Sequence, residues 1–211
     1  MNGHRLRRIA LAFMTVGLVG CMALAAPTAQ ARKKLVQKTF TKGVGSPSGG
    51  TALFIPDGAG QAAQLVRSPI NVKGLNKRGK IKDVNVGVRA GHQFAKDLEF
   101  YLASPRGVIS LSHDVGGQGN NYGGSFASCA GQFTLFDSDT PTRIDTPGLT
   151  APFAGTFAPM ESLNLLNGLG DKKATNATWS LLVEDDDPSN PSGVLFCWKL
   201  TLVTTNPKTK R

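Results

Sequence analysis

The sequence has 211 residues, a formal net charge of +10 and a hydrophobic fraction of 40%. This length fits one domain that can bury a sizeable core. The 25 glycines and 12 prolines interrupt the chain every few residues, which argues against a protein built from long helices. No aromatic or glycine-rich binding motif lies beside the basic residues, which argues against nucleic acid as a partner.

The N-terminus predicts export from the cytoplasm. Arginines in residues 5–8 precede an uncharged apolar run at 9–26, and small residues follow at Ala29 and Ala31. This order is typical of a secretory signal peptide, here residues 1–31, and predicts a secreted, extracellular protein.

Two other interpretations of the N-terminus remain open. As a membrane anchor, the apolar run is marginal for ~30 Å of hydrocarbon and is broken by glycines. Residues 18–21 resemble a bacterial lipobox, which would leave Cys21 as a lipid-anchored N-terminus. No later apolar stretch is long enough to span a membrane, so we expect no membrane span in the mature chain.

Basic residues gather near both ends of the mature chain. Residues 32–50 are basic and rich in Gly, Ser and Pro, which predicts a linker, and residues 205–211 form a basic tail. Such runs are usually solvated, and they would hold the protein near anionic cell-surface polymers. The domain itself is then predicted to span 51–204.

Between the glycines and prolines, apolar and polar residues alternate. In the last such segment Val194, Phe196, Trp198, Leu200 and Leu202 are expected to share one face. Alternation with turns between is typical of antiparallel strands with one wet face, and predicts an all-β sandwich or jelly roll. The alternating segments are 84–88, 98–102, 109–112, 179–184 and 194–202. Residues 162–166 are the one expected short helix.

Two cysteines, Cys129 and Cys197, remain after signal cleavage. An even pair in an exported chain predicts a disulfide bond, because the compartment is oxidising. The alternative is two buried free thiols.

The histidines offer little for catalysis. A serine-protease triad needs a histidine base, and only His92 and His113 follow the signal peptide. No serine lies in a Gly-x-Ser-x-Gly turn. We expect both histidines to be structural, with His113 in the core or at its rim.

Acidic residues offer a candidate calcium site. The run 184–187, with Asp185, Asp186 and Asp187, follows a predicted strand, and Asp137 with Asp139 lies in a long loop. Calcium prefers carboxylate and carbonyl oxygens from loops, and crowded carboxylates repel one another unless they are neutralised. A solvated turn is the alternative at both places.

Several of these segments match one known family in their order along the chain. The segments are Ile55-Pro56-Asp57, residues 81–86 with His92, residues 97–107, Gly116-Gly117 with Asn120, residues 153–159 with Leu163 and the 167–168 turn, and residues 179–185 and 193–200. Each motif alone is weak, but their order from about Leu65 to Val203 resembles the P domain, or Homo B domain, of proprotein convertases and bacterial subtilisin-like serine proteases.

The resemblance implies a galactose-binding-like jelly roll of about eight strands. In that family the domain follows a subtilisin-type catalytic domain, which it stabilises, and some members bind calcium. This sequence departs from the pattern because no catalytic domain precedes the matching region, so no triad is carried over. The resemblance implies that Asp97, Trp179 and Trp198 determine the fold. The cysteine pair is not a general feature of the family.

Three functions follow as hypotheses. The first is a secreted, non-catalytic accessory or binding module whose partner is a secreted protease or another envelope protein. The second is a calcium-stabilised cell-surface or carbohydrate-binding sandwich, for which exposed aromatics such as Tyr101 or Tyr122 would be the sign. The third, with the least support, is a peptidase in its own right.

Overall fold

The computed structural model describes residues 34–58, 65–124, 128–170, 176–188 and 192–206, all of which belong to one compact unit. The predicted signal peptide and most of the predicted C-terminal tail lie outside the described residues. In the described parts of the chain, no helix is long and apolar enough to cross a membrane.

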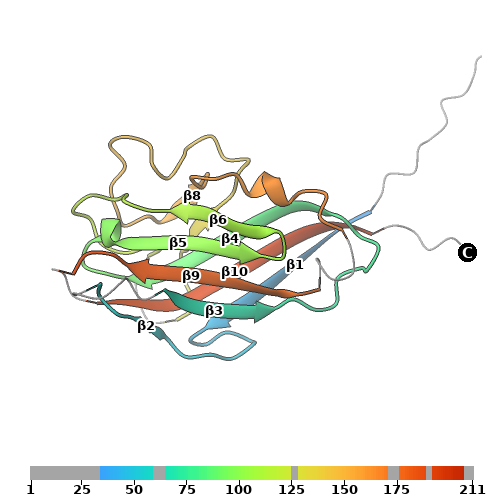
Figure 1. Cartoon of the computed structure of the whole chain (residues 1–211), viewed down its shortest axis with the longest axis horizontal. Helices are drawn as coiled ribbons and strands as arrows, with labels where there is room; N and C mark the ends of the chain where they lie inside the picture. The colour runs from blue at the N-terminus through green and yellow to red at the C-terminus, as the bar shows by residue number, and fades with distance from the viewer. Residues whose placement is uncertain (1–33, 59–64, 125–127, 171–175, 189–191, 207–211) are drawn as a thin grey trace, which may run out of the picture. The chain divides into compact units, whose positions relative to one another are not determined.

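The described chain contains ten strands and two short 3₁₀ helices (Figure 1). In chain order they are β1 (Lys34–Gly43), β2 (Leu53–Ile55), β3 (Val66–Asn71), β4 (Ile81–Gly91), η1 (Ala95–Asp97), β5 (Leu98–Ser104), β6 (Gly107–Ser112), β7 (Thr134–Phe136), β8 (Gly155–Phe157), η2 (Leu163–Leu166), β9 (Thr178–Asp185) and β10 (Gly193–Asn206).

The strands form two sheets that pack as the layers of a sandwich (Figure 1). One sheet has the order β1-β10-β4-β7-β8, with β2 paired to the start of β10. The other has the order β3-β9-β5-β6. Neighbours are antiparallel except β7 and β8. The predicted all-β sandwich is confirmed, with ten strands where about eight were expected; β2, β7 and β8 are only three residues long.

The core lies between the sheets and is built from the alternating residues. Val84, Val86 and Val88 of β4 are buried, as are Leu98, Phe100 and Leu102 of β5. The sequence placed these side chains correctly because a strand exposes alternate residues to opposite faces.

Both tryptophans predicted to determine the fold are fully buried. Trp179 lies on β9 and Trp198 on β10, so each sheet contributes one indole ring to the core. Large aromatic rings contribute more buried apolar area than any other residue type.

The alternation in β10 is interrupted by a β-bulge. Leu195 pairs with Ala90 and Cys197 with Arg89, so Phe196 is the extra residue. The expectation that Val194 and Phe196 share a face with Trp198 is therefore wrong: Leu195 and Cys197 are buried instead. An extra residue reverses the side-chain parity of everything before it.

Part of the predicted linker is a strand. The linker was expected at 32–50, yet Lys34–Gly43 pairs with β10 along its whole length. The structure thus extends the sandwich to β1. A basic edge strand needs few apolar residues, because one of its sides faces solvent, and here Phe40 packs against the core.

The predicted disulfide between Cys129 and Cys197 is confirmed, with the two Cα atoms 5.2 Å apart. It ties the loop before β7 to the bulged part of β10. Cys129 N also donates a hydrogen bond to Val44 O at 2.7 Å, so the end of β1 is held at the same place.

Candidate functional site

A buried charged cluster lies at the end of the sandwich where β4 and β9 finish. His92 follows β4, Asp97 ends η1 and Asp185 ends β9. Local contacts hold the histidine: its backbone N donates to Asn121 Oδ1 at 3.1 Å, and its Nδ1 lies 2.6 Å from Phe94 O and 3.0 Å from Phe94 N. The His92 and Asp185 side chains are fully buried and that of Asp97 is 1% exposed.

The imidazole of His92 lies between the two carboxylates. Its Nε2 is 2.9 Å from Asp185 Oδ2, and its Nδ1 is 3.8 Å from Asp97 Oδ2. Buried polar groups are tolerated when polar partners are close, so these contacts link the ends of β4, η1 and β9.

Burial raises the pKa of Asp185 to about 6, and the nearby carboxylate of Asp97 adds to this rise. Contact with His92 works in the opposite direction and favours the charged form. Asp185 therefore titrates above the usual range of a carboxyl group.

Lys96 connects this cluster to the surface. Its Nζ lies 2.6 Å from Asp97 Oδ1 and 3.4 Å from Asp187 Oδ2, and the hydrogen bond to Asp97 raises the pKa of Lys96. A hollow of about 310 Å³ opens beside them, lined by Lys96, Asp97, Asp114, Asp186, Asp187 and Pro188.

The acidic run 185–187 is divided between the interior and the surface. Asp185 points into the protein against His92, whereas Asp186 is exposed and Asp187 faces Lys96. Asp185 is the last residue of β9, whereas Asp186 and Asp187 follow the strand and line the hollow beside Lys96. The ammonium of Lys96 already supplies a positive charge between Asp97 and Asp187.

More carboxylates crowd the same end. Glu99 and Glu184 are directly opposite each other on β5 and β9, and burial together with Glu99 raises the pKa of Glu184. Tyr101 donates its hydroxyl hydrogen to Glu99. Glu99, His113 and Asp114 also offer one ligand atom each within 4.8 Å of one another.

A second acidic group forms on another part of the sandwich. Asp83, Asp137 and Asp139 each place one carboxylate oxygen within 4.8 Å of the others. Asp139 N donates to Asp137 Oδ1 at 2.9 Å, which fixes the turn. Burial, with the charges of Asp137 and Asp139, raises the pKa of Asp83.

Sequence reasoning singled out Asp137 and Asp139 but missed Asp83. The register of β4 against β7 explains the arrangement, because Val86 lies opposite Phe136 and continuing that register brings Asp83 toward Asp139. The alternation of both segments was visible in the sequence, but their pairing was not.

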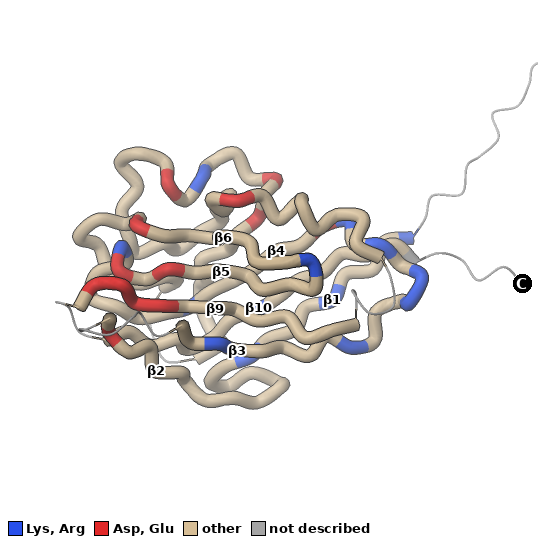
Figure 2. The backbone as a smooth tube through the Cα atoms, in the orientation of Figure 1, with Lys and Arg blue, Asp and Glu red and all other residues tan. Residues whose placement is uncertain are grey.

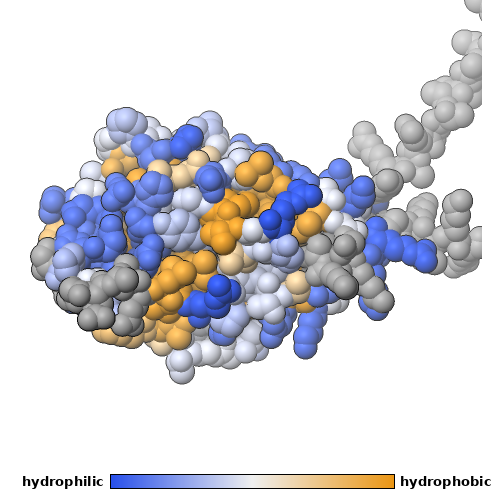
Figure 3. Space-filling model, in the orientation of Figure 1, coloured by the Kyte–Doolittle hydropathy of each residue, from blue (hydrophilic) through white to orange (hydrophobic). Residues whose placement is uncertain are grey.

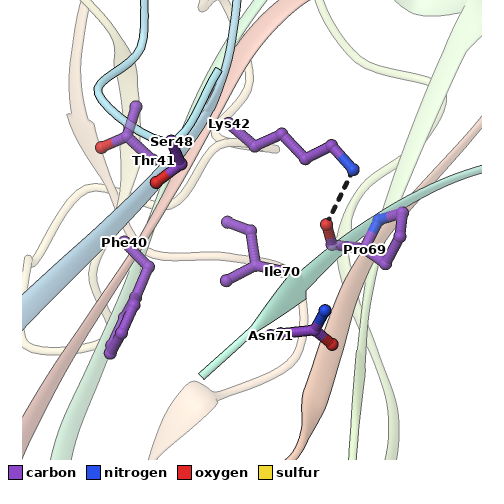
Figure 4. Close-up of a pocket in the computed structure, with 7 residues that line it drawn as sticks. All are labelled: Phe40, Thr41, Lys42, Ser48, Pro69, Ile70 and Asn71. Carbon is purple, nitrogen blue, oxygen red and sulfur yellow. Dashed lines mark hydrogen bonds between the residues drawn. The ribbon is translucent and has the colours of Figure 1, made fainter. Parts of the chain in front are cut away.

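Two hollows lie away from these acidic residues. One, of about 250 Å³, opens between the edge strands β1 and β3, where Lys42 Nζ donates to Pro69 O at 3.0 Å (Figure 4). Its other lining residues are Phe40, Thr41, Ser48, Ile70 and Asn71. It is more polar than apolar and holds no titratable group besides Lys42.

The other hollow, of about 360 Å³, is apolar and lies between the β5–β6 turn and η2. Val108 is 58% exposed and Leu165 is 61% exposed at its rim, and Arg106 donates to Leu165 O at 2.8 Å. Figure 3 shows apolar residues (orange) in patches on the face that the four-stranded sheet turns to the viewer.

The aromatic residues named for carbohydrate binding are not exposed platforms. Tyr122 is buried, with its hydroxyl 2.8 Å from Ser112 Oγ and its ring 4.7 Å from that of Phe100. Tyr101 is half-buried. Tyr122 therefore does not supply the exposed aromatic ring that carbohydrate binding would need, because the glycine-rich loop returns this residue to the core as a bridge to Ala90.

Comparison with known proteins gives limited information. No protein-family model matches the sequence, and no curated protein matches it. Among solved structures, the serine protease of Aeromonas sobria in complex with its chaperone aligns with 82% of this chain at 19% identity and a TM-score of 0.40. The same protease alone aligns with 81% at 19% identity and a TM-score of 0.37. The aligned region is 27% of each protease chain, about a quarter of its length.

Proposed function

We propose that this chain is a secreted, non-catalytic accessory module of the P-domain type, which binds and stabilises a secreted subtilisin-like serine protease. The motif order in the sequence and the two-sheet sandwich support the proposal. The disulfide between Cys129 and Cys197 fits an oxidising compartment outside the cytoplasm.

The observation that carries the proposal is the cluster of His92, Asp97 and Asp185. These residues come from three separate segments of the resemblance, and the fold brings all three into contact in its interior. The contact makes the three motifs stronger support for the resemblance than each motif is alone. A buried titratable side chain needs a partner, so these residues have to occur together.

The surroundings of the histidines support a non-catalytic role. The His92 side chain is fully buried, against Asp185 and the backbone of Phe94. His113 is half-buried, with its Nδ1 3.4 Å from Asp114 Oδ2 and its backbone N bonded to Met160 Sδ. A nucleophile, base and orienting acid in line are the mark of a triad. Among the described residues, the hydrogen-bond partners of the two histidines include no serine, threonine or cysteine side chain.

Co-purification tests the proposed partner. The tagged chain is isolated from the medium of its own cells, with free tag as the control, and the proteins that accompany it are identified. We expect a subtilisin-like protease whose half-life at elevated temperature lengthens when the purified chain is added back. Failure to retain or stabilise any secreted protease would remove the proposal. Hydrolysis of a peptide library that is lost in His92→Ala or His113→Ala would instead make the chain a peptidase.

A second candidate property is calcium binding at Asp83, Asp137 and Asp139. Three carboxylates within reach of one ion are the oxygen ligands that calcium prefers. Asn85 Nδ2 donates a hydrogen bond to Asp83 Oδ2 at 2.9 Å. Asn85 Oδ1 is buried with no hydrogen-bond partner in the described residues, which makes it a candidate fourth oxygen ligand. The run at 185–187 fits calcium less well, since Lys96 occupies it.

Thermal unfolding tests the calcium site. Calcium at 100 times its dissociation constant would stabilise the fold by about 2.7 kcal/mol over a chelated sample. Asp83→Asn should abolish the shift, whereas Asp114→Asn, in the other acidic group, should keep it. Equal melting temperatures with calcium and with chelator would contradict the assignment.

A further inference from the structure

Positive charge gathers at the end of the sandwich opposite the His92 cluster. Figure 2 shows Lys and Arg (blue) at the end where β1 begins and β10 finishes, and most Asp and Glu (red) elsewhere. We call this surface the basic end and define it by its exposed residues, which are Lys34, Lys73, Lys77, Arg78, Lys80 and Lys82.

Strand pairing and backbone hydrogen bonds bring these residues together although they are distant in the sequence. Lys34 is the register partner of Asn206, and Ile81 is the partner of Thr204. Thr205 N donates to Lys80 O at 2.9 Å, and Lys80 N donates to Thr205 Oγ1 at 3.0 Å. The segment 72–82 is thereby fixed beside both the first and the last strand.

The segment 72–82 presents its basic side chains from a rigid backbone. Val72, Leu75 and Ile81 are buried and anchor it to the core. Hydrogen bonds also hold its backbone to other segments: Leu75 N donates to Asn176 Oδ1 at 3.2 Å, and Ile81 N donates to Leu169 O at 2.9 Å. The backbone that carries these cationic side chains is therefore ordered before any ligand arrives, which lowers the entropic cost of binding.

The charges of the basic end are not neutralised within the described protein. None of these six residues forms an ion pair with another described residue, and the ion pairs of Lys96 and Arg143 lie outside this surface. The chain also continues from this end into basic sequence, with Lys33 before β1 and Lys208 after β10. Six exposed cations in one region repel one another, and a bound polyanion would reduce this electrostatic repulsion.

We infer that the basic end is a binding surface for a flexible anionic polymer with closely spaced phosphate or sulfate groups. Five of its six cations are lysines, which act as hydrated point charges and suit repeated anions better than a single ligand in a pocket. Together with the proposed function, this surface would hold the module at a charged extracellular matrix while the opposite end stays accessible.

The surface fits other anionic partners less well. Membrane-surface binding normally adds an apolar face that inserts between lipids, and Leu35 is the one large exposed apolar side chain among the described residues beside Lys34. Single-stranded nucleic acid is normally stacked on aromatic rings, and residues 72–82 contain none.

A matched pair of triple variants tests the inference. The first, Lys77→Gln with Arg78→Gln and Lys80→Gln, removes three charges from the basic end. The control, Arg67→Gln with Arg106→Gln and Arg143→Gln, removes three exposed charges elsewhere, so the net charge is the same. Melting curves establish that both variants fold.

Heparin, as a sulfated polymer, and inorganic polyphosphate are the probes. We expect the unaltered protein to bind at least one of them, with affinity that falls steeply between ~50 and ~200 mM salt. The first variant should bind about 10- to 100-fold more weakly at ~50 mM salt, and its slope of log affinity against log salt should be shallower by about 2. The control should change less than about threefold.

Three results would overturn the inference. The control could weaken binding as much as the first variant, which would indicate net charge alone. A second such result is that the unaltered protein binds neither heparin nor polyphosphate. Binding could also be confined to vesicles of anionic lipid or to single-stranded DNA, which would assign the surface to a different partner.

Discussion

Trp198 Nε1 donates a hydrogen bond to Ser68 Oγ at 2.9 Å, and both residues are buried in the core. Trp198 belongs to β10 of one sheet and Ser68 to β3 of the other, so this bond crosses the sandwich. An indole N–H buried without an acceptor would cost about 1–3 kcal/mol. The single serine thus lets a large ring lie in the core with its polar atom satisfied.

Trp198→Phe should lower the free energy of unfolding by about 2–3 kcal/mol, because it removes both the hydrogen bond and part of the ring volume. Ser68→Ala should cost about 1–2 kcal/mol, since it leaves the indole N–H unsatisfied. Urea unfolding of both variants and of the double variant measures the coupling. If the two losses simply added, the bond would not be the link between these positions.

Removing the disulfide should destabilise the protein by roughly 4 kcal/mol in the chain-entropy model, because the bond closes a loop with a sequence separation of 68 residues. Cys129→Ser with Cys197→Ser and chemical reduction of the unaltered protein should give similar losses in denaturant unfolding. Equal stability of the oxidised and reduced forms would contradict this expectation.

Gly43→Ala should destabilise the protein more than Gly107→Ala, although the two glycines have similar φ angles of +138° and +143°. A Cβ at Gly43 would lie 2.2 Å from Phe196 O and 2.6 Å from Cys197 Cα, whereas a Cβ at Gly107 meets nothing within 4 Å. We expect about 1 kcal/mol for backbone strain at Gly107 and about 2–4 kcal/mol for strain plus displacement of β1 at Gly43. Matched melting curves provide the comparison, and equal losses would show that the contact with β10 is not limiting.

The Asp185 carboxyl should make stability fall as the pH rises from about 4 to 6. Its pKa in the fold is about 6 against an ordinary value of 3.8, so within this window the folded protein holds a proton that the unfolded chain releases. The loss across the window should be on the order of 1–2 kcal/mol. The titratable groups around Asp185 are His92, which contacts it, and Asp97, which is paired with Lys96. These three residues are unchanged in this test.

Asp185→Asn should flatten that part of the pH profile, even if it lowers stability at every pH. Asp145→Asn is the control, because its exposed pairing with Arg143 lowers the pKa of Asp145 and makes it contribute in the opposite sense. Unfolding free energies at pH 4, 5, 6 and 7 decide the matter. An unaltered slope in Asp185→Asn would mean that other carboxyl groups cause the pH dependence.

Local patterns predicted much of the fold and little of the site. The alternation at 84–88, 98–102 and 179–183 identified strands, because successive side chains of a strand point to opposite faces and so apolar and polar residues alternate in the sequence. The bulge at Phe196 could not be anticipated, since one extra residue is defined only by its partner strand. The same limit hid the contacts of His92 with Asp185 and of Asp83 with Asp139, which depend on strand pairing between distant segments. The basic end was likewise seen only as terminal charge, because the position of 72–82 follows from its bonds to β10.

The pairing of Lys34 with Asn206 also has a practical use. Adjacent strands lie about 5 Å apart, so a short linker would join the two positions and permit new termini elsewhere. A circular permutant opened at the β5–β6 turn, between Ser104 and Gly107, should keep the sandwich. For the same reason the domain could be grafted into a surface loop of a host enzyme without forcing that loop apart.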